Sequence, residues 1–441
     1  MEQRRKNLTQ LFIPICLETL LYMLSGMVDT LMLSSVNDQA VGAVGTANTY
    51  IGIFIIMFSV ISSGMVAVMT QNIGAGRPGV AYQARQLGLT FNAVLGIIVS
   101  LILTFGAGAI LAGVGVADAL MQPARTYLQI VGGFCILNAL IPICSSYLRA
   151  FGFSKEPLYA SIIGNVINFC LNAFFLFVLH KGVAGVATAT VISRIINLVI
   201  VVLLGAVLVK AKQHPERESN REVMGQIIRI GLPSACETAI YNVSMTLVIR
   251  FLNQMDAQGL NVTARSYTMQ ITNFSYCVGA ALAQANAIMT GWHIGAKEYD
   301  ACDRGTKKAA VIGVIVAVIL ETVFTLCSGW IMQLFSKDPQ MVSLVGKLLA
   351  IDIVLEMGRV TNLVYGQALK TSGDAVFPVV MGACFMILCS VGGTYLFGIR
   401  LGLLAVGAYI GMTGDECVRA VGMYLRWKSG KWKEKGLVKS R

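Results

Sequence analysis

IPICLETLLY at residues 13–22 and LPSACETAIY at residues 232–241 are two copies of one pattern in a chain of 441 residues. Each copy has a proline, a glutamate four residues later, a threonine directly after the glutamate, and a tyrosine three residues beyond that. The two glutamates, Glu18 and Glu237, are 219 positions apart. The pattern predicts a fold built from two repeats, with a carboxylate at the same place in an apolar run of each.

The composition is typical of a membrane protein. Hydrophobic residues make up 56% of the chain and charged residues only 13%, whereas a soluble domain has about 25% charged residues. The formal net charge of +12 comes mainly from Lys and Arg in alternate gaps between apolar runs. This bias is typical of cytoplasmic loops, so the basic gaps are predicted to face the cytoplasm and no nucleic-acid partner is expected.

Apolar runs of about 20 residues, the length that crosses roughly 30 Å of hydrocarbon, recur along the chain. We count twelve, near residues 9–34, 46–70, 87–113, 127–148, 158–179, 184–209, 225–252, 267–291, 309–333, 342–368, 376–397 and 402–426. An even number of spans places both termini on the same side of the membrane, and the basic gaps predict that this side is the cytoplasm. The first run carries Glu18 and Asp29 and has no small-residue cleavage site, so we expect a transmembrane helix there and not a signal peptide.

Two further pairs of segments support the duplication. VMTQNIGAG (68–76) is similar to IMTGWHIGA (288–296), and YLRAFGFS (147–154) is similar to YGQALKTS (365–372), at nearly the same offset. Because each half has six spans, both halves enter the membrane from the same side. We therefore predict an all-α integral membrane protein with two six-helix bundles related by a pseudo-two-fold axis along the membrane normal, as in many secondary transporters. The expected parts are an N-terminal lobe, a cytoplasmic linker and a C-terminal lobe with a basic tail, at residues 1–212, 213–222 and 223–441.

Polar side chains inside the first half point to a cation site. A charged side chain at the centre of a bilayer costs about 2.5–3.5 kcal/mol on insertion scales, so such residues usually face the interior and serve function. Asp29 lies in the first span, and Asn165, Asn168 and Asn172 share one face of the fifth. If Asp29 faces Asn168 and Asn172, the resulting oxygen-rich pocket would suit Na⁺ or a proton on the carboxyl. The alternative is that the amides only hydrogen-bond neighbouring helices.

Other intramembrane acids are candidates for the substrate cavity that a secondary transporter requires. For Glu237 the nearest basic residue in sequence is Arg229, about two helical turns away, so we expect Glu237 to have no ion pair. Glu356 and Arg359, three residues apart, instead predict an internal ion pair. The candidate cavity residues are Glu18, Tyr22, Glu237, Tyr241 and Glu356. The alternative for the two repeated glutamates is that both are protonated and stabilise kinked helices.

The residues that commonly carry catalysis do not form a site in this sequence. The eleven cysteines have no CxxC spacing, and the three histidines are scattered at the ends of spans, so no zinc site or disulfide framework is expected. The glycines of NIGAGRPG follow no strand and precede no Lys-Ser/Thr, which argues against a phosphate loop. We therefore expect neither an enzyme nor a cofactor, and an ion gradient as the energy source.

Several segments together resemble the multidrug and toxic compound extrusion (MATE) family of the MOP flippase superfamily, over essentially the whole chain. They are GMVDTLML (26–33), TQNIGAGRP (70–78), YLRAFGFSKEP (147–157), NFCLNAFFLF (168–177), GVAGVATATVIS (182–193), LEMGRVTNLVYGQALKTSGDAVFP (355–378) and RWKSGKW (426–432). No single segment is specific, but their order and spacing are. The resemblance implies a multi-pass protein of the bacterial cytoplasmic membrane that exports organic compounds, often lipophilic cations, in exchange for Na⁺ or H⁺.

The resemblance also implies functional positions. The coupling-cation site falls on Asp29, Asn168, Asn172 and Thr190. One branch of the family has an aspartate where this chain has Asn172, so a charge is missing here and the choice between Na⁺ and H⁺ stays open. The implied partners are small organic cations and membrane lipids, with a monomeric chain. The superfamily also contains flippases of lipid-linked substrates, which is the alternative function, but such flippases commonly line their cavity with basic residues.

Overall fold

The structure is a computed structural model that describes residues 6–34, 38–113, 116–256, 258–333 and 335–438. These residues form helices and connecting turns, with no β-strand among them. The elements of the first half are α1 (Leu8–Ser34), α2 (Asp38–Gly74), α3 (Pro78–Gly113), α4 (Asp118–Gly133), α5 (Ile136–Ala150), α6 (Lys155–Ala173), η1 (Phe174–Val178), α7 (Gly182–Leu208) and η2 (Lys210–Gln213). Those that follow are α8 (Asn220–Met255), α9 (Leu260–Gly295), α10 (Tyr299–Leu326), α11 (Ser328–Met332), α12 (Pro339–Ser372), α13 (Val376–Phe385), η3 (Met386–Val391), η4 (Thr394–Arg400), α14 (Leu404–Lys428) and η5 (Lys431–Glu434).

The long helices correspond to the apolar runs of the sequence. Seven segments are long and apolar enough to cross a membrane, and the pair α4 and α5, bent by 43°, makes an eighth. Four more helices, α8, α9, α12 and α14, have 25 to 36 residues and so are also long enough. They carry more polar and ionisable side chains, which lower their hydropathy. In the part of the chain that the structure describes, the predicted twelve spans thus correspond to twelve helical segments.

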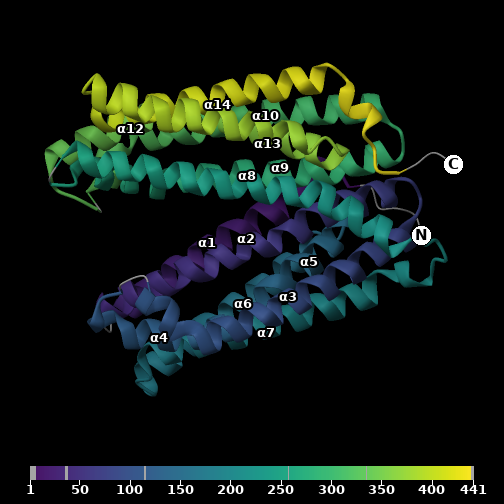
Figure 1. The fold of residues 1–441 in the computed structure, drawn as a ribbon, viewed down its shortest axis with the longest axis horizontal. Helices are drawn as coiled ribbons and strands as arrows, with labels where there is room; N and C mark the ends of the chain where they lie inside the picture. Colours follow the sequence, from purple (N-terminus) through teal and green to yellow (C-terminus); the bar gives the residue numbers. More distant parts are fainter. Residues whose placement is uncertain (1–5, 35–37, 114–115, 257, 334, 439–441) are drawn as a thin grey trace. The chain divides into compact units, whose positions relative to one another are not determined.

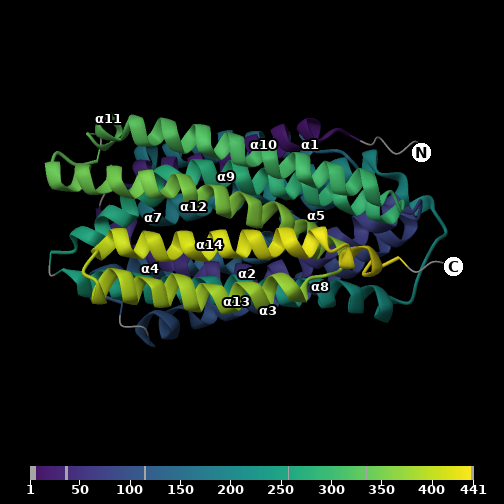
Figure 2. The same cartoon turned by 90° about the horizontal axis from the view of Figure 1, so that it is seen from above.

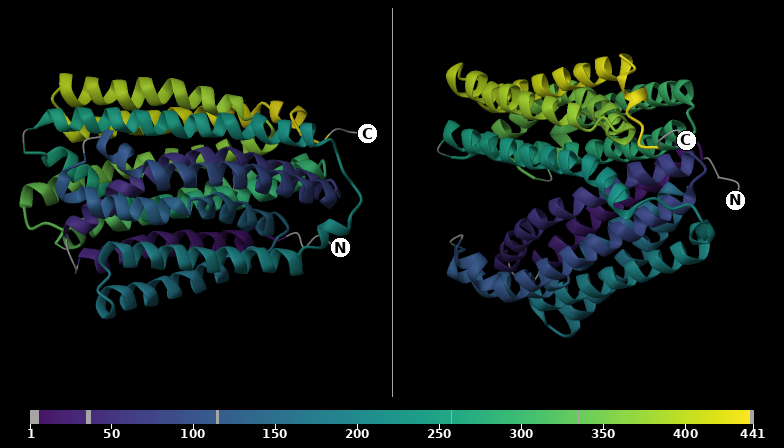
Figure 3. Two further views of the ribbon diagram at one scale, coloured as in Figure 1. Left: turned by 60° about the horizontal axis from the view of Figure 1, so that its bottom comes forward. Right: turned by 45° about the vertical axis from the view of Figure 1, so that its right-hand side comes forward.

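The chain divides into two compact units, Met1–Leu232 and Pro233–Arg441 (Figure 1). The division lies inside α8 and not at residue 223, because the linker and the first turns of α8 pack against unit 1. The Gln83 amide of α3 donates to the carbonyl of Glu218 over 2.7 Å, and the Glu218 N–H donates back to Gln83 over 3.0 Å. Arg77 pairs with the Glu218 carboxylate at 2.6 Å. Figure 3 shows the linker at the end of unit 1 where the chain begins.

Two glycines bring α8 into backbone contact with α2 within unit 1. A Cβ atom on Gly231 would lie 1.6 Å from the carbonyl oxygen of Val60, and one on Gly64 would lie 2.0 Å from that of Ile227. Real Cβ atoms do not approach this closely, so any side chain at either position would separate the helices. The contact therefore depends on glycine at both places.

Each unit has its own apolar core. In unit 1, side chains of α2, α3, α4, α5 and α7 form a buried cluster that includes Phe58, Leu103 and Leu128. In unit 2, α12 is the central helix and packs against α9, α10 and α14, as Figure 2 shows for α10, α12 and α14. Its core includes Leu252, Leu348 and Tyr409. These cores hold the polar side chains of the spans in fixed positions.

Candidate functional site: intramembrane acids and their partners

The Asp29 carboxylate of α1 lies against two amides of α6, as the sequence predicts. The Nδ2 group of Asn172 donates a hydrogen bond to Asp29 Oδ1 over 2.7 Å and another to Asn168 Oδ1 over 3.2 Å. Asn168 and Asn172 are both buried. The Oδ1 atom of Asn172 is also buried and has no hydrogen-bond partner, so an unused acceptor lies beside the carboxylate.

Thr190 of α7 is buried, but its hydroxyl donates to the carbonyl of Val186 in its own helix, at 2.9 Å. The hydrogen bonds of the described residues therefore join Asp29 with Asn168 and Asn172 but not with Thr190. Asn165, which shares their helix, keeps a buried amide nitrogen with no partner.

Arg194 of α7 also belongs to this site and was not predicted from the sequence. Its guanidinium donates to Asn138 Oδ1 at 2.8 Å and acts electrostatically on both Asp29 and Tyr127. The hydroxyl of Tyr127 bonds in turn to Asn48 of α2. An arginine in the middle of the sixth apolar run was the available signal, because intramembrane cations usually pair with an acid.

The two repeated glutamates are ion-paired, each within its own unit. Arg149 at the end of α5 lies 2.6 Å from Glu18 of α1, and Lys370 at the end of α12 lies 2.5 Å from Glu237 of α8. All four side chains are between 11% and 15% exposed. The expectation that Glu237 has no basic partner is therefore wrong, because the partner comes from a different helix and distance along the sequence does not reveal it.

The two bases are not matched residues of the repeat. When YLRAFGFS is aligned with YGQALKTS, Arg149 corresponds to Gln367, and Lys370 stands three residues further on. Three residues are nearly one helical turn, so Lys370 projects from the next turn of the same helix face. The ion pair is repeated although the aligned residue is not.

The other proposed cavity residues differ in their surroundings. Tyr22 of α1 is 67% exposed. Tyr241 of α8 is half-buried and lies beside Arg359, Asp415 and Glu416 around a small cavity. Glu356 of α12 is fully buried and pairs with Arg359, which confirms the predicted ion pair.

That pair belongs to a larger buried network in unit 2. Arg359 also lies 3.5 Å from Glu416 of α14, and Arg419 of α14 lies 2.9 Å from Glu416 and 2.8 Å from Asp415. Amide and hydroxyl donors complete the network, from Asn362 to Glu416 at 3.0 Å and from Ser390 to Asp415 at 2.9 Å. Paired and hydrogen-bonded charges of this kind hold α12 and α14 in one register.

A further acid, Glu321 of α10, lies close to this network. It is fully buried, and the Ser275 hydroxyl of α9 is the hydrogen-bonding group beside its carboxyl oxygens. Asp352 and Glu356 of α12 act on it electrostatically. The residues that the structure describes contain no group of three His, Cys, Asp or Glu side chains that could hold a metal ion.

Comparisons with known proteins agree with this architecture. The MatE family model matches residues 14–174 and 233–396, one segment in each unit. A relative described as the uncharacterized transporter YisQ of Bacillus subtilis is 34% identical over 96% of this chain and 94% of its own length. "Probable multidrug resistance protein NorM" of Thermotoga maritima is 22% identical over 98% of this chain and 94% of its own. The structure of an outward-facing MATE transporter of the MOP superfamily has a TM-score of 0.86 at 18% identity, covering 98% of this chain and 96% of that one.

Two six-span units with ionisable side chains buried inside the spans define a multi-pass membrane transporter. The chain belongs to the MatE family, the multidrug and toxic compound extrusion transporters. The family resemblance of the sequence segments and the all-α fold with twelve membrane helices in two bundles are confirmed. The protein is a transporter and not an enzyme.

Proposed function

We propose that this protein exports organic, lipophilic cationic compounds across the bacterial cytoplasmic membrane in exchange for protons, with Asp29 as the coupling carboxylate. The observation that carries the proposal is the single Asn172 amide group shared between Asp29 and Asn168 inside unit 1. This arrangement links one contact between α1 and α6 to the charge of a single carboxyl group.

The surroundings of Asp29 favour a proton over Na⁺. A hard cation binds best among several oxygen ligands, whereas one carboxylate and two amides are found here. Of the two amide oxygens, Asn168 Oδ1 already accepts a hydrogen bond and Asn172 Oδ1 alone is unused. Arg194 supplies a positive charge that acts on the same carboxylate, which opposes a second cation. A proton instead neutralises the carboxylate and needs no further ligands.

Protonation of Asp29 would change the contacts of α1. The charge-assisted bond from Asn172 and the attraction of Arg194 both weaken when the carboxylate becomes neutral. α1 would then repack relative to α6, and the cargo would bind better to one of the two arrangements. Coupling requires that the proton and the cargo favour different conformations.

The proposed cargo contacts are the exposed ring of Tyr22, the ring of Tyr241, and the carboxylates Glu18 and Glu237. An organic cation is attracted to an aromatic face, and it can replace the base paired with each glutamate. Glu356 is buried with Arg359, so we assign it to the internal network of unit 2. We further propose that the chain is monomeric. We also propose that both termini and the linker face the cytoplasm, because Lys and Arg are concentrated in these segments and such a bias is typical of cytoplasmic loops.

The test is efflux of a fluorescent lipophilic cation from proteoliposomes under an imposed pH gradient and, separately, a Na⁺ gradient. Wild type should respond to the pH gradient, Asp29→Asn should lose this response, and Asp118→Asn, at an exposed acid of α4, should keep it. Export driven only by Na⁺ would overturn the proton assignment. If neither gradient moves any cation tried, the drug-export proposal fails and a flippase for a lipid-linked or other amphipathic substrate replaces it.

A further inference from the structure

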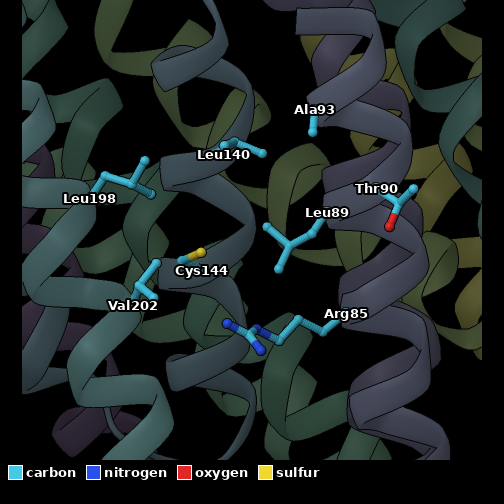
Figure 4. A pocket seen from close by; sticks show the side chains of 8 residues that line it. All are labelled: Arg85, Leu89, Thr90, Ala93, Leu140, Cys144, Leu198 and Val202. Carbon is cyan, nitrogen blue, oxygen red and sulfur yellow. The ribbon is translucent and has the colours of Figure 1, made fainter.

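An open groove of about 350 Å³ lies on unit 1 between α3, α5 and α7 (Figure 4). Its apolar walls include Leu89 and Ala93 of α3, Leu140 of α5, and Leu198 and Val202 of α7. The Arg85 side chain crosses one end of the groove. One end of the groove is therefore cationic, and the remainder is apolar apart from Thr90 and Cys144.

The groove runs along the helices. Arg85 and Ala93, eight residues apart on α3, are separated by about 12 Å along the helix axis. Arg85 lies seven residues, or about 10 Å, inside the start of α3, and Val202 lies about 9 Å before the end of α7. The start of α3 lies beside η2, which directly follows α7, and beside the linker residue Glu218. The cationic end is thus nearer the membrane surface than the apolar part.

The guanidinium of Arg85 has no carboxylate partner among the described residues. It lies over the Tyr147 ring, 4.7 Å from the centroid, and its buried Nε has no hydrogen-bond acceptor. A second guanidinium, of Arg217, is 5.8 Å from the Tyr82 ring, and Arg85 is 6.0 Å from the same ring. Arg217 donates to three backbone carbonyls of unit 1, those of Gly79, His214 and Glu216.

We propose that this groove binds one anionic phospholipid of the cytoplasmic leaflet, with an acyl chain along the apolar walls and the phosphate on Arg85. Planar guanidinium groups bind phosphate oxygens in a bidentate manner, and basic pockets between membrane helices on the cytoplasmic side recognise anionic headgroups. The stacking on Tyr147 fixes the guanidinium, which also bonds to the Cys144 sulfur and keeps a buried Nε–H without an acceptor.

Other occupants fit the groove less well. Water would need two to four polar partners for each molecule, and the walls are largely apolar. A cationic cargo would be repelled by Arg85. An anionic lipid satisfies both the charge and the apolar walls, and its acyl chains run in the same direction as the groove.

The test is lipid titration of the purified, delipidated full-length chain in detergent, followed by native mass spectrometry. Phosphatidylglycerol and phosphatidylcholine with identical acyl chains are compared. Wild type should bind one phosphatidylglycerol about fivefold more tightly than phosphatidylcholine, the effect expected of one interfacial arginine. Arg85→Gln should remove this preference and Arg85→Lys should keep part of it, whereas Arg125→Gln in α4 should have no effect. Val202→Trp should weaken the binding of both lipids by filling the groove.

Several outcomes would overturn the inference. Equal affinity of wild type for both lipids, or an unchanged preference in Arg85→Gln, would show that Arg85 does not select an anionic lipid. Competition by soluble glycerol phosphate at the same concentration as the lipid would indicate a site for free phosphate. If Val202→Trp converts a dimer into a monomer without affecting lipid binding, the groove is an interface between two copies. The measurement involves no transport, so its failure is distinguishable from failure of the antiport proposal.

Discussion

Glu18 and Glu237, 219 positions apart in sequence, each pair with a basic side chain at the end of a later helix of the same unit. The basic partner is Arg149 in unit 1 and Lys370 in unit 2. Two different bases at unaligned positions satisfy the same carboxylate in both repeats. The ion pair between these helices is therefore a duplicated feature of the fold.

Removal of one partner of the Glu237–Lys370 ion pair should destabilise the protein. Exposed ion pairs contribute about 0–1 kcal/mol, and breaking a fully buried pair costs about 3–5 kcal/mol. Glu237 and Lys370 are mostly buried, so Glu237→Gln should lower the free energy of unfolding by about 2 kcal/mol, between these limits. Thermal unfolding in detergent measures this change.

The double variant Glu237→Gln with Lys370→Gln is the control. It should recover part of the loss, because no unpaired charge is left buried. If the two single effects simply add in the double variant, the side chains do not interact and the ion pair contributes nothing to stability.

Relationships that lie within one helix or repeat along the chain are predictable from the sequence. The Glu356–Arg359 pair follows from a three-residue spacing, and the twelve spans follow from the apolar runs. Polar residues within the spans raised the contact of Asp29 with Asn172, and the family resemblance placed the same residues in one site. Lys370 was missed as the partner of Glu237 because tertiary packing decides it, and a shift of one helical turn conceals it in the repeat alignment.

Gly231→Ala should be strongly destabilising. The added Cβ atom would lie 1.6 Å from the Val60 carbonyl oxygen, so α8 and α2 must separate. Gly225 of the same helix has no atom within 4 Å of its ideal Cβ position. Gly225→Ala should therefore be neutral or stabilising by up to about 1 kcal/mol, because alanine favours helix over glycine. The test compares the thermal unfolding midpoints of Gly231→Ala and Gly225→Ala.

Equal midpoints for the two variants would show that α8 does not approach α2 this closely.

The segment around η5, which contains Lys435, should detach from the turn between α12 and α13 at acidic pH. Asp374, in the turn between α12 and α13, accepts hydrogen bonds from Arg426 at 2.7 Å and Lys435 at 2.9 Å. Burial acts to raise the pKa of Asp374, but these hydrogen bonds and charges outweigh it, and the pKa lies below the ordinary value of 3.8. An acid with a lowered pKa stabilises the fold above its unfolded pKa, and this stabilisation is lost as the pH falls through the folded value.

Tryptophan fluorescence can follow this detachment, because Trp427 and Trp432 are stacked with their ring centroids 4.2 Å apart. The wild-type signal should change as the pH falls below about 4, near the pKa of a free aspartate. Asp374→Asn should already show the altered signal at pH 7 and should lose this acid transition. An acid transition that is unchanged in the variant would exclude Asp374 as its cause.

Asn172→Asp should increase the response of the protein to Na⁺. The substitution places a second carboxylate beside Asp29, with which Asn172 now shares a hydrogen bond of 2.7 Å. Two carboxylates together with Asn168 Oδ1 supply the oxygen ligands that a hard cation requires. Their two negative charges exceed the single positive charge of Arg194. We expect NaCl to raise the thermal midpoint of Asn172→Asp relative to choline chloride, and to leave that of wild type unchanged. Asn165→Asp on the same helix controls for a general effect of added charge. If Na⁺ already stabilises wild type, the site accepts Na⁺ without a second carboxylate, and proton coupling at Asp29 would have to be abandoned.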